Sequence, residues 1–392
     1  MIRHRLVAFS AALLMPTLAI AADESRGDWA AAWGYAATEP NPNDVTYGPG
    51  TYEYRARLTN SGSAIVLTFE NPENHPATTL ASVEISLPAA ADGFVIEPGT
   101  THSVTFSGRA GAELVAGRAL TSDAIEFPAI DGQDVIVRAR FTRRTQPGRA
   151  DLAMPVAFVE DGGQTRTEIN ARPFLSLISV RDPGHTCTVL AFGDSITDGV
   201  LSRSRSIRGW PGRLAERFAA QPADQRCGVV NMGIGGNRVL RDGRGAAALE
   251  RFTHDVAAVP GVTHLIVLEG INDIGNDGGG DHPTATPESL TQAYQQIIAR
   301  AHQLGIKVIG GTLTPALHAA YMSPEKERTR VAVNEWIRTS GAFDAVIDFD
   351  AAVRDPKAPA DLQPAFDPGD HLHPNDFGYR AMGDAIDLDI FK

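Results

Sequence analysis

A serine that follows an apolar run is the first residue of this sequence whose setting suggests chemistry. Ser195 lies in Thr188–Gly199, which reads T-V-L-A-F-G-D-S-I-T-D-G. The apolar residues 189–192 and the glycine after them are typical of a buried parallel strand that ends and presents the next side chains to solvent. A serine hydroxyl is a weak nucleophile at neutral pH, so it needs a base, a group that orients this base, and donors for the developing oxyanion.

Three blocks further along the chain offer these groups. Gly233–Arg238 (G-I-G-G-N-R) follows the apolar pair at 229–230, and Gly270–Asp273 (G-I-N-D) follows an apolar run at 265–268. Asp370–Pro374 (D-H-L-H-P) lies just ahead of an expected last helix. Because adjacent parallel strands deliver their carboxyl ends to one edge of a sheet, we expect the blocks to converge there.

In this order, the four blocks resemble those of the SGNH (GDSL-type) hydrolase family, and the resemblance covers Cys187 to about Leu388. It implies that Ser195 is the nucleophile, that His373 is the general base and that Asp370 orients this histidine. It also implies a flavodoxin-like, doubly wound α/β fold. The activity implied is cleavage of carboxylic esters without a cofactor or a metal ion.

The same resemblance identifies an oxyanion hole. Its donors would be the backbone N–H of Ser195, the backbone N–H of Gly235 and the side-chain amide of Asn272. A carboxamide suits this task because it can donate to an oxyanion without changing its charge. The alternative is that Asn272 only forms a turn, as Asn often does beside Gly.

The last block has a second acid and a second histidine nearby that could take the same roles. Asp367 and His371 are the local rivals of Asp370 and His373, and the position within the motif favours the latter pair. All four side chains could instead be the ligands of a metallohydrolase, because carboxylates and imidazoles in one loop can hold a divalent ion.

The length and charge of the chain limit the classes of function. The chain has 392 residues, 21% of them charged, and a formal net charge of −12. This length predicts two domains and a leader. The negative charge argues against nucleic acid and anionic membrane surfaces as partners, because both bind basic protein faces.

Residues 1–21 have the features of a secretory signal peptide. Arg3 and Arg5 precede an apolar segment, and Ala19-Ile20-Ala21 forms a small-x-small cleavage signature. The protein is therefore expected to be secreted or periplasmic, with no membrane span in its mature form.

Cys187 and Cys227, the only cysteines of the chain, are expected to form a disulfide after export. Each lies eight residues before a block residue, Ser195 and Gly235 respectively. If the two strands are parallel neighbours, these equal offsets place the cysteines side by side. Two buried free thiols are the alternative.

Residues 22–180 have the pattern of an all-β domain. Short segments that alternate or are rich in β-branched residues recur between Asn, Gly and Pro, which predicts a β-sandwich or jelly roll. The clearest segments are residues 52–58, 64–69, 82–87, 102–106 and 135–141. Trp29 and Trp33 precede these segments, and we expect them to pack in the core rather than to form a platform for sugars.

Residues 181–186 are rich in breakers and predict a linker, after which strands and helices alternate through residues 187–392. Five strands are expected, at residues 189–192, 229–230, 265–268, 307–311 and 345–349. With helices between them, they would form the parallel sheet that the resemblance implies.

These features together predict a secreted serine ester hydrolase that forms an acyl-serine intermediate. The resemblance to the SGNH family implies short acyl esters as substrates, acetyl esters in particular, including those on polysaccharides. Two alternatives stay open: a lipase or arylesterase that acts on free short-chain esters, and a carbohydrate-binding protein whose α/β domain is inert. The sequence does not choose the natural ester, the role of the N-terminal domain or the oligomeric state.

Overall fold

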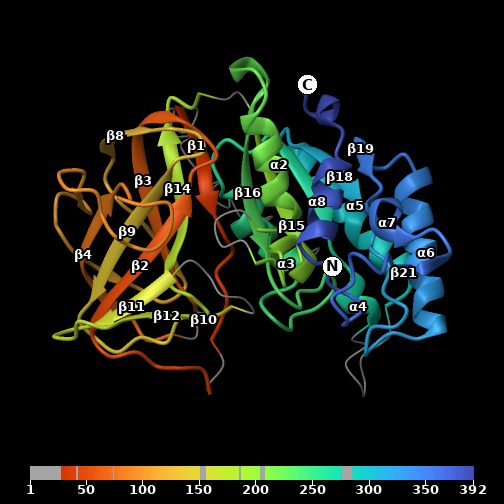
Figure 1. Ribbon diagram of the computed structural model, residues 1–392, viewed down its shortest axis with the longest axis horizontal. Coiled ribbons are helices and arrows are strands. Elements are labelled where there is room, and N and C mark those ends of the chain that lie inside the picture. Colours follow the sequence, from red (N-terminus) through yellow and green to blue (C-terminus); the bar gives the residue numbers. More distant parts are fainter. Residues whose placement is uncertain are drawn as a thin grey trace, which may run out of the picture.

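The computed structural model describes residues 28–40, 43–73, 75–150, 156–184, 187–203, 208–275 and 285–392. A β-rich region formed by the N-terminal half lies beside an α/β region formed by the C-terminal half (Figure 1). The predicted signal peptide, residues 1–21, lies outside the described residues. In the part of the chain that is described, no helix is long and apolar enough to cross a membrane.

The N-terminal region is an antiparallel β-sandwich, as predicted. One sheet has the order β1-β14-β3-β7, with β8 also paired to β3, and the other has the order β12-β11-β2-β9-β4-β5, with β6 also paired to β4. The first sheet consists of β1 (Trp29–Gly34), β14 (Leu175–Arg181), β3 (Gly62–Asn71), β7 (Arg118–Thr121) and β8 (Ile125–Ala129). The second consists of β12 (Arg166–Glu168), β11 (Val156–Glu160), β2 (Gly50–Arg57), β9 (Asp134–Phe141), β4 (Thr78–Ser86), β5 (His102–Val104) and β6 (Ala112–Leu114). A separate small sheet pairs β10 (Gly148–Arg149) with β13 (Ala171–Arg172).

Side chains that alternate along the strands fill the space between the two large sheets. Tyr52, Phe69 and Phe141 are fully buried in this core. The expectation of core packing holds for Trp33, which lies half-buried against the same core. It does not hold for Trp29, because the register of β1 shifts between Ala31 and Trp33, so Trp29 faces away from that core and lines a cavity between the two regions.

A five-stranded parallel sheet forms the centre of the C-terminal region, with the order β16-β15-β17-β18-β19. Counted along the sequence this is the order 2-1-3-4-5, so the flavodoxin-like prediction is confirmed. The strands are β15 (Cys187–Gly193), β16 (Cys227–Gly233), β17 (His264–Leu268), β18 (Lys307–Gly311) and β19 (Ala345–Ile347). Each of them overlaps a predicted segment.

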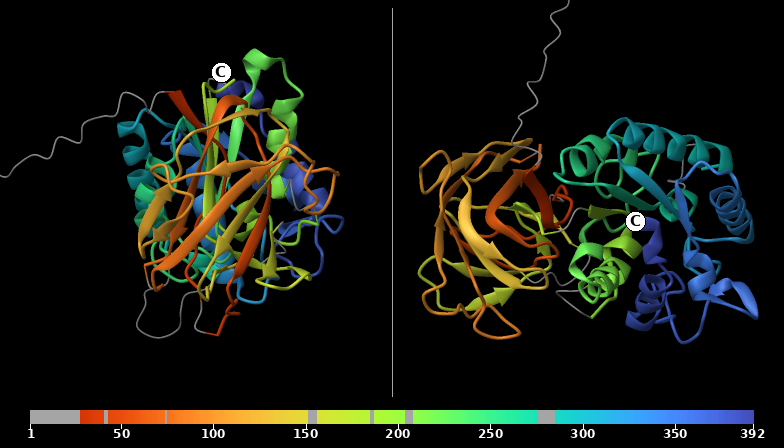
Figure 2. Two further views of the ribbon diagram at one scale, coloured as in Figure 1. Left: turned by 90° about the vertical axis from the view of Figure 1, so that its left-hand side faces the viewer. Right: turned by 90° about the horizontal axis from the view of Figure 1, so that it is seen from above.

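Helices cover both faces of this sheet. α2 (Gly209–Ala219) and α8 (Asp376–Asp384) pack together on one face, and α3 (Ala248–Phe252) and α5 (Pro287–Gln303) lie on the other (Figure 2, right). α6 (Pro324–Thr339) packs beside α5. The shorter elements are α1 (Ser195–Asp198), η2 (Ala223–Gln225), η3 (Thr253–Ala257), α4 (Ile271–Gly275), α7 (Phe349–Val353), β20 (Arg354–Asp355), β21 (Ala358–Leu362) and η4 (Leu388–Phe391).

The chain passes from the sandwich to the parallel sheet between Arg181, where β14 ends, and Cys187, where β15 starts. Among the described strands, no ladder joins the sandwich to the parallel sheet. We propose that residues 22–180 and 187–392 are two domains joined by residues 181–186. We call them the sandwich domain and the α/β domain.

A disulfide joins the first two strands of the parallel sheet. Cys187 and Cys227 lie opposite each other in the ladder, with Cα atoms 4.8 Å apart, so the predicted pairing is confirmed. The pairing follows from the register, because β15 and β16 match residue for residue down to Gly193 and Gly233.

The sandwich domain covers β16, which is an edge strand of the parallel sheet (Figure 1). Thr59 Oγ1 accepts from the N–H of Val229 (3.0 Å) and donates to its carbonyl oxygen (2.9 Å). An uncovered edge would leave such groups open to pairing with another chain. The apolar core of the α/β domain also takes in Ala31, Ala36 and Leu177 of the sandwich domain, so the two domains share a buried interface.

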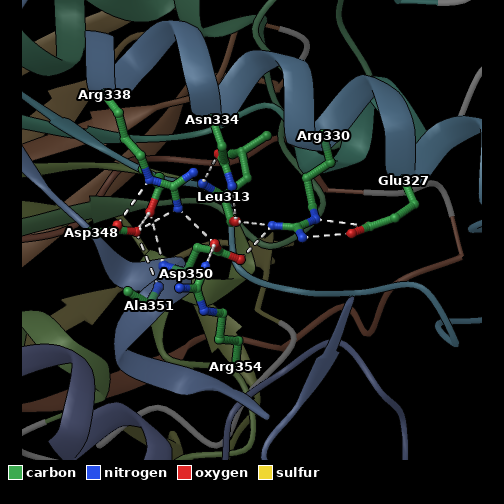
Figure 3. Close-up of polar contacts among 10 residues, drawn as sticks. Leu313, Glu327, Arg330, Asn334, Arg338, Asp348, Asp350, Ala351 and Arg354 are labelled. Carbon is green, nitrogen blue, oxygen red and sulfur yellow. Dashed lines mark hydrogen bonds and ion pairs between the residues drawn. The ribbon is translucent and has the colours of Figure 1, made fainter. Parts of the chain in front are cut away.

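A buried network of charges joins α6 to the segment after β19, on the side of the sheet away from the sandwich domain (Figure 3). The side chain of Arg330 is 2% exposed and donates to Glu327, Asp350 and the carbonyl oxygen of Leu313. Arg338 shares the Asp350 carboxylate. Because an unpaired buried charge costs several kcal/mol, this mutual pairing fixes α7 on α6.

An ion pair between His254 and Glu70 crosses the domain interface. His254 Nε2 lies 3.3 Å from Glu70 Oε1, and His254 Nδ1 lies 2.6 Å from Asp255 Oδ1. The hydrogen bond to Asp255, followed by that to Glu70, raises the pKa of His254 to about 10 and outweighs the opposing effect of burial.

We expect this ion pair to stabilise the protein in a pH-dependent way. Because the pKa in the folded state lies above the unfolded value of about 6.5, the contribution is fully present below roughly pH 6.5 and is lost as pH rises through about 10. In thermal melts, His254→Gln should therefore lower the Tm at about pH 6, and the difference from wild type should close above about pH 10. Glu70→Gln should show the same trend, and a difference that stays constant with pH would contradict it.

Candidate active site

Ser195 begins α1 directly after β15, where the predicted strand ends. Asp194 is the N-cap of this helix, and its carboxylate accepts from the N–H of Ile196 (2.9 Å). The first N–H groups of a helix have no acceptor within the helix. The Ser195 N–H accordingly donates to no acceptor among the described residues.

The side chains of Ser195, His373 and Asp370, the expected catalytic triad, are linked by hydrogen bonds. His373 Nε2 lies 2.8 Å from Ser195 Oγ, and His373 Nδ1 lies 2.7 Å from Asp370 Oδ2. Asp370 Oδ1 accepts from the N–H groups of Leu372 (3.1 Å) and His373 (3.0 Å). The loop between β21 and α8 carries both the acid and the histidine, and it brings them to the end of β15.

The Asp370 carboxyl is held in its charged form. Burial alone would raise its pKa, but the hydrogen bonds from the His373 ring and from the backbone N–H groups of His373 and Leu372 outweigh this effect and lower the pKa to about 2. At neutral pH a carboxylate therefore faces the imidazole, and it can accept the Nδ1–H and fix which ring nitrogen carries the proton.

The rival pair lies apart from Ser195. His371 Nδ1 lies 2.6 Å from Asp367 Oδ2, and about half of the His371 side chain is exposed. The described structure shows no hydrogen bond between this pair and Ser195. The metal alternative has no matching geometry in the described ranges, where no three His, Cys, Asp or Glu side chains are grouped to hold an ion.

Asn272 lies in α4, directly after β17, and its amide is oriented by two neighbours. Asn272 Nδ2 donates to the carbonyl oxygen of Asn237 (3.0 Å), and Asn272 Oδ1 accepts from the Tyr321 hydroxyl (3.3 Å). An amide nitrogen carries two hydrogens, so one N–H remains for another acceptor. β17 pairs with β15 up to Gly193 and Leu268, which places this amide at the same sheet edge as Ser195.

The glycine-rich block forms a tight turn after β16. The N–H of Asn237 donates to the carbonyl oxygen of Ile234 (3.0 Å), with Gly235 and Gly236 between them. Gly236 has φ +75°, a left-handed conformation that favours glycine. Within the described part of the chain, neither glycine N–H has an acceptor, so the turn offers a second open amide beside the predicted one of Gly235.

A buried arginine that the sequence did not single out connects these strand ends. Arg251 of α3 donates to Asn237 Oδ1 (2.9 Å) and to the carbonyl oxygens of Met232 (2.8 Å) and Gly193 (3.0 Å). A single arginine in a helix carries no signal of such a role. Asn237 and Asp273 were missed as well, although they lie inside the predicted blocks, and Asp273 accepts from two N–H groups of the loop after the turn.

Three carboxyls that interact with one another are buried close to Ser195 and Asn272 in the sequence. Burial raises the pKa of Asp194 to about 7, and it also raises the pKa values of Glu269 and Asp273. Arg251 Nη2 lies 3.5 Å from Glu269 Oε2 and offsets part of this effect.

Comparison with known proteins relates the C-terminal half of the chain to one family. Residues 191–381 match the model of the GDSL-like lipase/acylhydrolase family. A GDSL-like lipase from Bacteroides thetaiotaomicron is similar at 20% identity and a TM-score of 0.39, over 52% of this chain and 87% of that one. Axe2, an acetylxylan esterase from Geobacillus stearothermophilus, is similar at 20% identity and a TM-score of 0.39, over 51% of this chain and 93% of that one. A comparison with curated proteins gave no match.

Proposed function

We propose that this chain, a carboxylic ester hydrolase whose residues 191–381 match the GDSL-like lipase/acylhydrolase family, is a secreted serine esterase. In this proposal it cleaves acetyl esters through an acyl-serine intermediate. The observation that carries the mechanism is the 2.8 Å contact between Ser195 Oγ and His373 Nε2. The Cys187–Cys227 disulfide supports export, because disulfides persist in oxidising compartments.

In the proposed first step, Ser195 Oγ attacks the ester carbonyl carbon and its proton passes to His373 Nε2. Asp370 accepts the Nδ1–H and stabilises the imidazolium that forms. The carbonyl π electrons move to oxygen, where the N–H groups of Ser195 and Gly235 and the Asn272 amide stabilise the charge. As the carbonyl re-forms, the C–O bond breaks and the alcohol leaves with the proton from His373. Water then releases the acid by the same sequence.

The role proposed for Asn272 predicts a change in kcat. Asn272→Ala should lower kcat by about 10²- to 10³-fold with little change in KM, because the amide is needed chiefly when charge develops on the oxygen. Tyr321→Phe should have a smaller effect in the same direction, since it removes only the donor that orients Asn272 Oδ1. Steady-state kinetics with p-nitrophenyl acetate measures both. A rise in KM alone would assign Asn272 to ground-state binding.

The proposed substrate class follows from the resemblance to the SGNH (GDSL-type) family, which implies short acyl esters. Its test is the release of acetate from a panel of acetylated polysaccharides, beside p-nitrophenyl esters of increasing acyl length. We expect acetate release from at least one polysaccharide and kcat/KM values that fall as the acyl chain lengthens. Values that rise with chain length would favour a lipase. Polysaccharide binding without turnover of p-nitrophenyl acetate would favour a carbohydrate-binding protein.

A further inference from the structure

Arg172 of the sandwich domain makes buried polar contacts with the α/β domain. Arg172 ends β13, and its side chain is 1% exposed. Its Nη2 lies 2.7 Å from Asp198 Oδ2 and donates to the carbonyl oxygen of Gly233 (3.0 Å). Its Nη1 donates to the carbonyl oxygen of Ala36 (2.9 Å). The guanidinium thus joins two polar groups of the α/β domain to one of its own domain.

The two partners of Arg172 in the α/β domain flank the candidate active site. Asp198 is the last residue of α1, the helical turn that Ser195 begins. Gly233 is the last residue of β16 and lies directly before the turn that contains Gly235. One guanidinium therefore spans the nucleophile turn and the strand that carries the proposed oxyanion donor.

The backbone around this contact leaves little room for movement. A Cβ atom at Gly233 would lie 2.3 Å from the backbone nitrogen of Asp198, so α1 lies directly against the end of β16. Arg208 Nη2 lies 3.2 Å from the other carboxylate oxygen of Asp198. Arg172 and Arg208 together hold this carboxylate from two sides, which fixes the C-terminal end of α1.

Another part of the domain interface is open. Cavities of about 780 Å³ and about 530 Å³ lie between the two domains, and His254 and Glu70 line both of them. Arg172 lines neither cavity. The close polar contact at Arg172 is therefore a local feature of the interface rather than a consequence of uniform packing.

We infer that Arg172 is a positioning residue for the proposed ester hydrolysis, on which this inference rests. It sets the position of Ser195 relative to the Gly235 turn, so the sandwich domain completes the active site and is not only a separate binding module. An error of about 1 Å between reacting groups can cost on the order of 10²-fold in rate. Loss of Arg172 should therefore lower kcat more than substrate affinity.

Arg55 provides a matched control within the same domain. Its side chain is 8% exposed, and like Arg172 it contacts one carboxylate, that of Asp134 (2.7 Å), and two carbonyl oxygens, those of Gly93 (2.7 Å) and Ala90 (3.0 Å). Arg55→Gln removes a buried arginine of comparable environment whose polar partners, named above, all belong to the sandwich domain. It therefore measures the effect of destabilising the sandwich domain alone.

The test is kcat for p-nitrophenyl acetate in the full chain, divided by the number of sites that a fluorophosphonate titrates. Arg172→Gln should lower kcat per titrated site by about tenfold or more, with KM within about twofold. Arg55→Gln should keep kcat per titrated site within about twofold. An unchanged value in Arg172→Gln, or an equal fall in both variants, would overturn the inference.

A second variant covers the case in which Arg172→Gln does not fold. Arg172→Lys keeps the charge but loses the planar fork that reaches both Asp198 and Gly233. A fall in its kcat per titrated site supports the inference, and a wild-type value overturns it. If wild-type protein hydrolyses the ester without reacting with the fluorophosphonate, the proposed serine mechanism fails and the inference falls with it.

Discussion

Ser195→Ala is expected to fold like wild type and to lose kcat for ester hydrolysis by at least about 10³-fold. Among the described residues, Ser195 Oγ has one hydrogen-bond partner, His373 Nε2. Its removal leaves the Asp194 cap of α1 in place, so the thermal midpoint should change little. Without the hydroxyl no acyl-enzyme can form, and only the charge-stabilising groups around it remain to promote attack by water.

Ser202→Ala is the control for this variant. Ser202 lies seven residues further along the chain, and its Oγ lies 2.9 Å from an oxygen of Asp376. It also removes a hydrogen-bonded serine hydroxyl, yet it should keep kcat within about twofold of wild type. Wild-type turnover in Ser195→Ala would remove the acyl-serine mechanism altogether.

The two histidines of the D-H-L-H-P block should give opposite results. His373→Ala should lower kcat by about 10³-fold or more, because the base that receives the Ser195 proton is lost. His371→Asn should retain most of the activity. His371 has φ +60°, and asparagine tolerates this left-handed conformation, so the substitution tests the side chain without straining the loop.

The comparison is informative because the two histidines share one feature, an ion pair with an aspartate of the same loop. Each has its Nδ1 within 2.7 Å of an aspartate oxygen, but only His373 contacts Ser195 in the described structure. If His371→Asn abolished activity and His373→Ala did not, the loop would enter the site in the other register. Tm values for both variants separate this result from a loss of folding.

The parts of the fold that depend on local pattern could be predicted from the sequence. Buried parallel strands are apolar runs bounded by breakers, and this pattern located all five strands of the parallel sheet, although not the short strands β20 and β21. Once two strands are assigned as parallel neighbours, equal offsets fix their register, which is why the pairing of Cys187 with Cys227 could be predicted. Three of the four blocks of the candidate site follow those strands, so the convergence of these three was predictable too, whereas the D-H-L-H-P block lies in the loop between β21 and α8.

The parts that depend on tertiary packing could not be predicted. Arg172 and Gly233 are separated by 61 positions in sequence and belong to different domains, and nothing around Arg172 indicates that its side chain is buried. In the sequence, Arg251 is an ordinary helical arginine. Its role depends on contacts with the ends of β15 and β16, which only the folded structure shows. A lone charged residue is usually solvated, so sequence patterns favour the surface for such residues.

The most direct test of the proposed mechanism is peptide mass spectrometry after reaction with a fluorophosphonate. We predict one adduct, on Ser195, which forms in step with the loss of p-nitrophenyl acetate hydrolysis and is absent from Ser195→Ala. Inactivation with the adduct on a different residue, or full activity in protein whose Ser195 is modified, would contradict the assignment of Ser195 as the nucleophile.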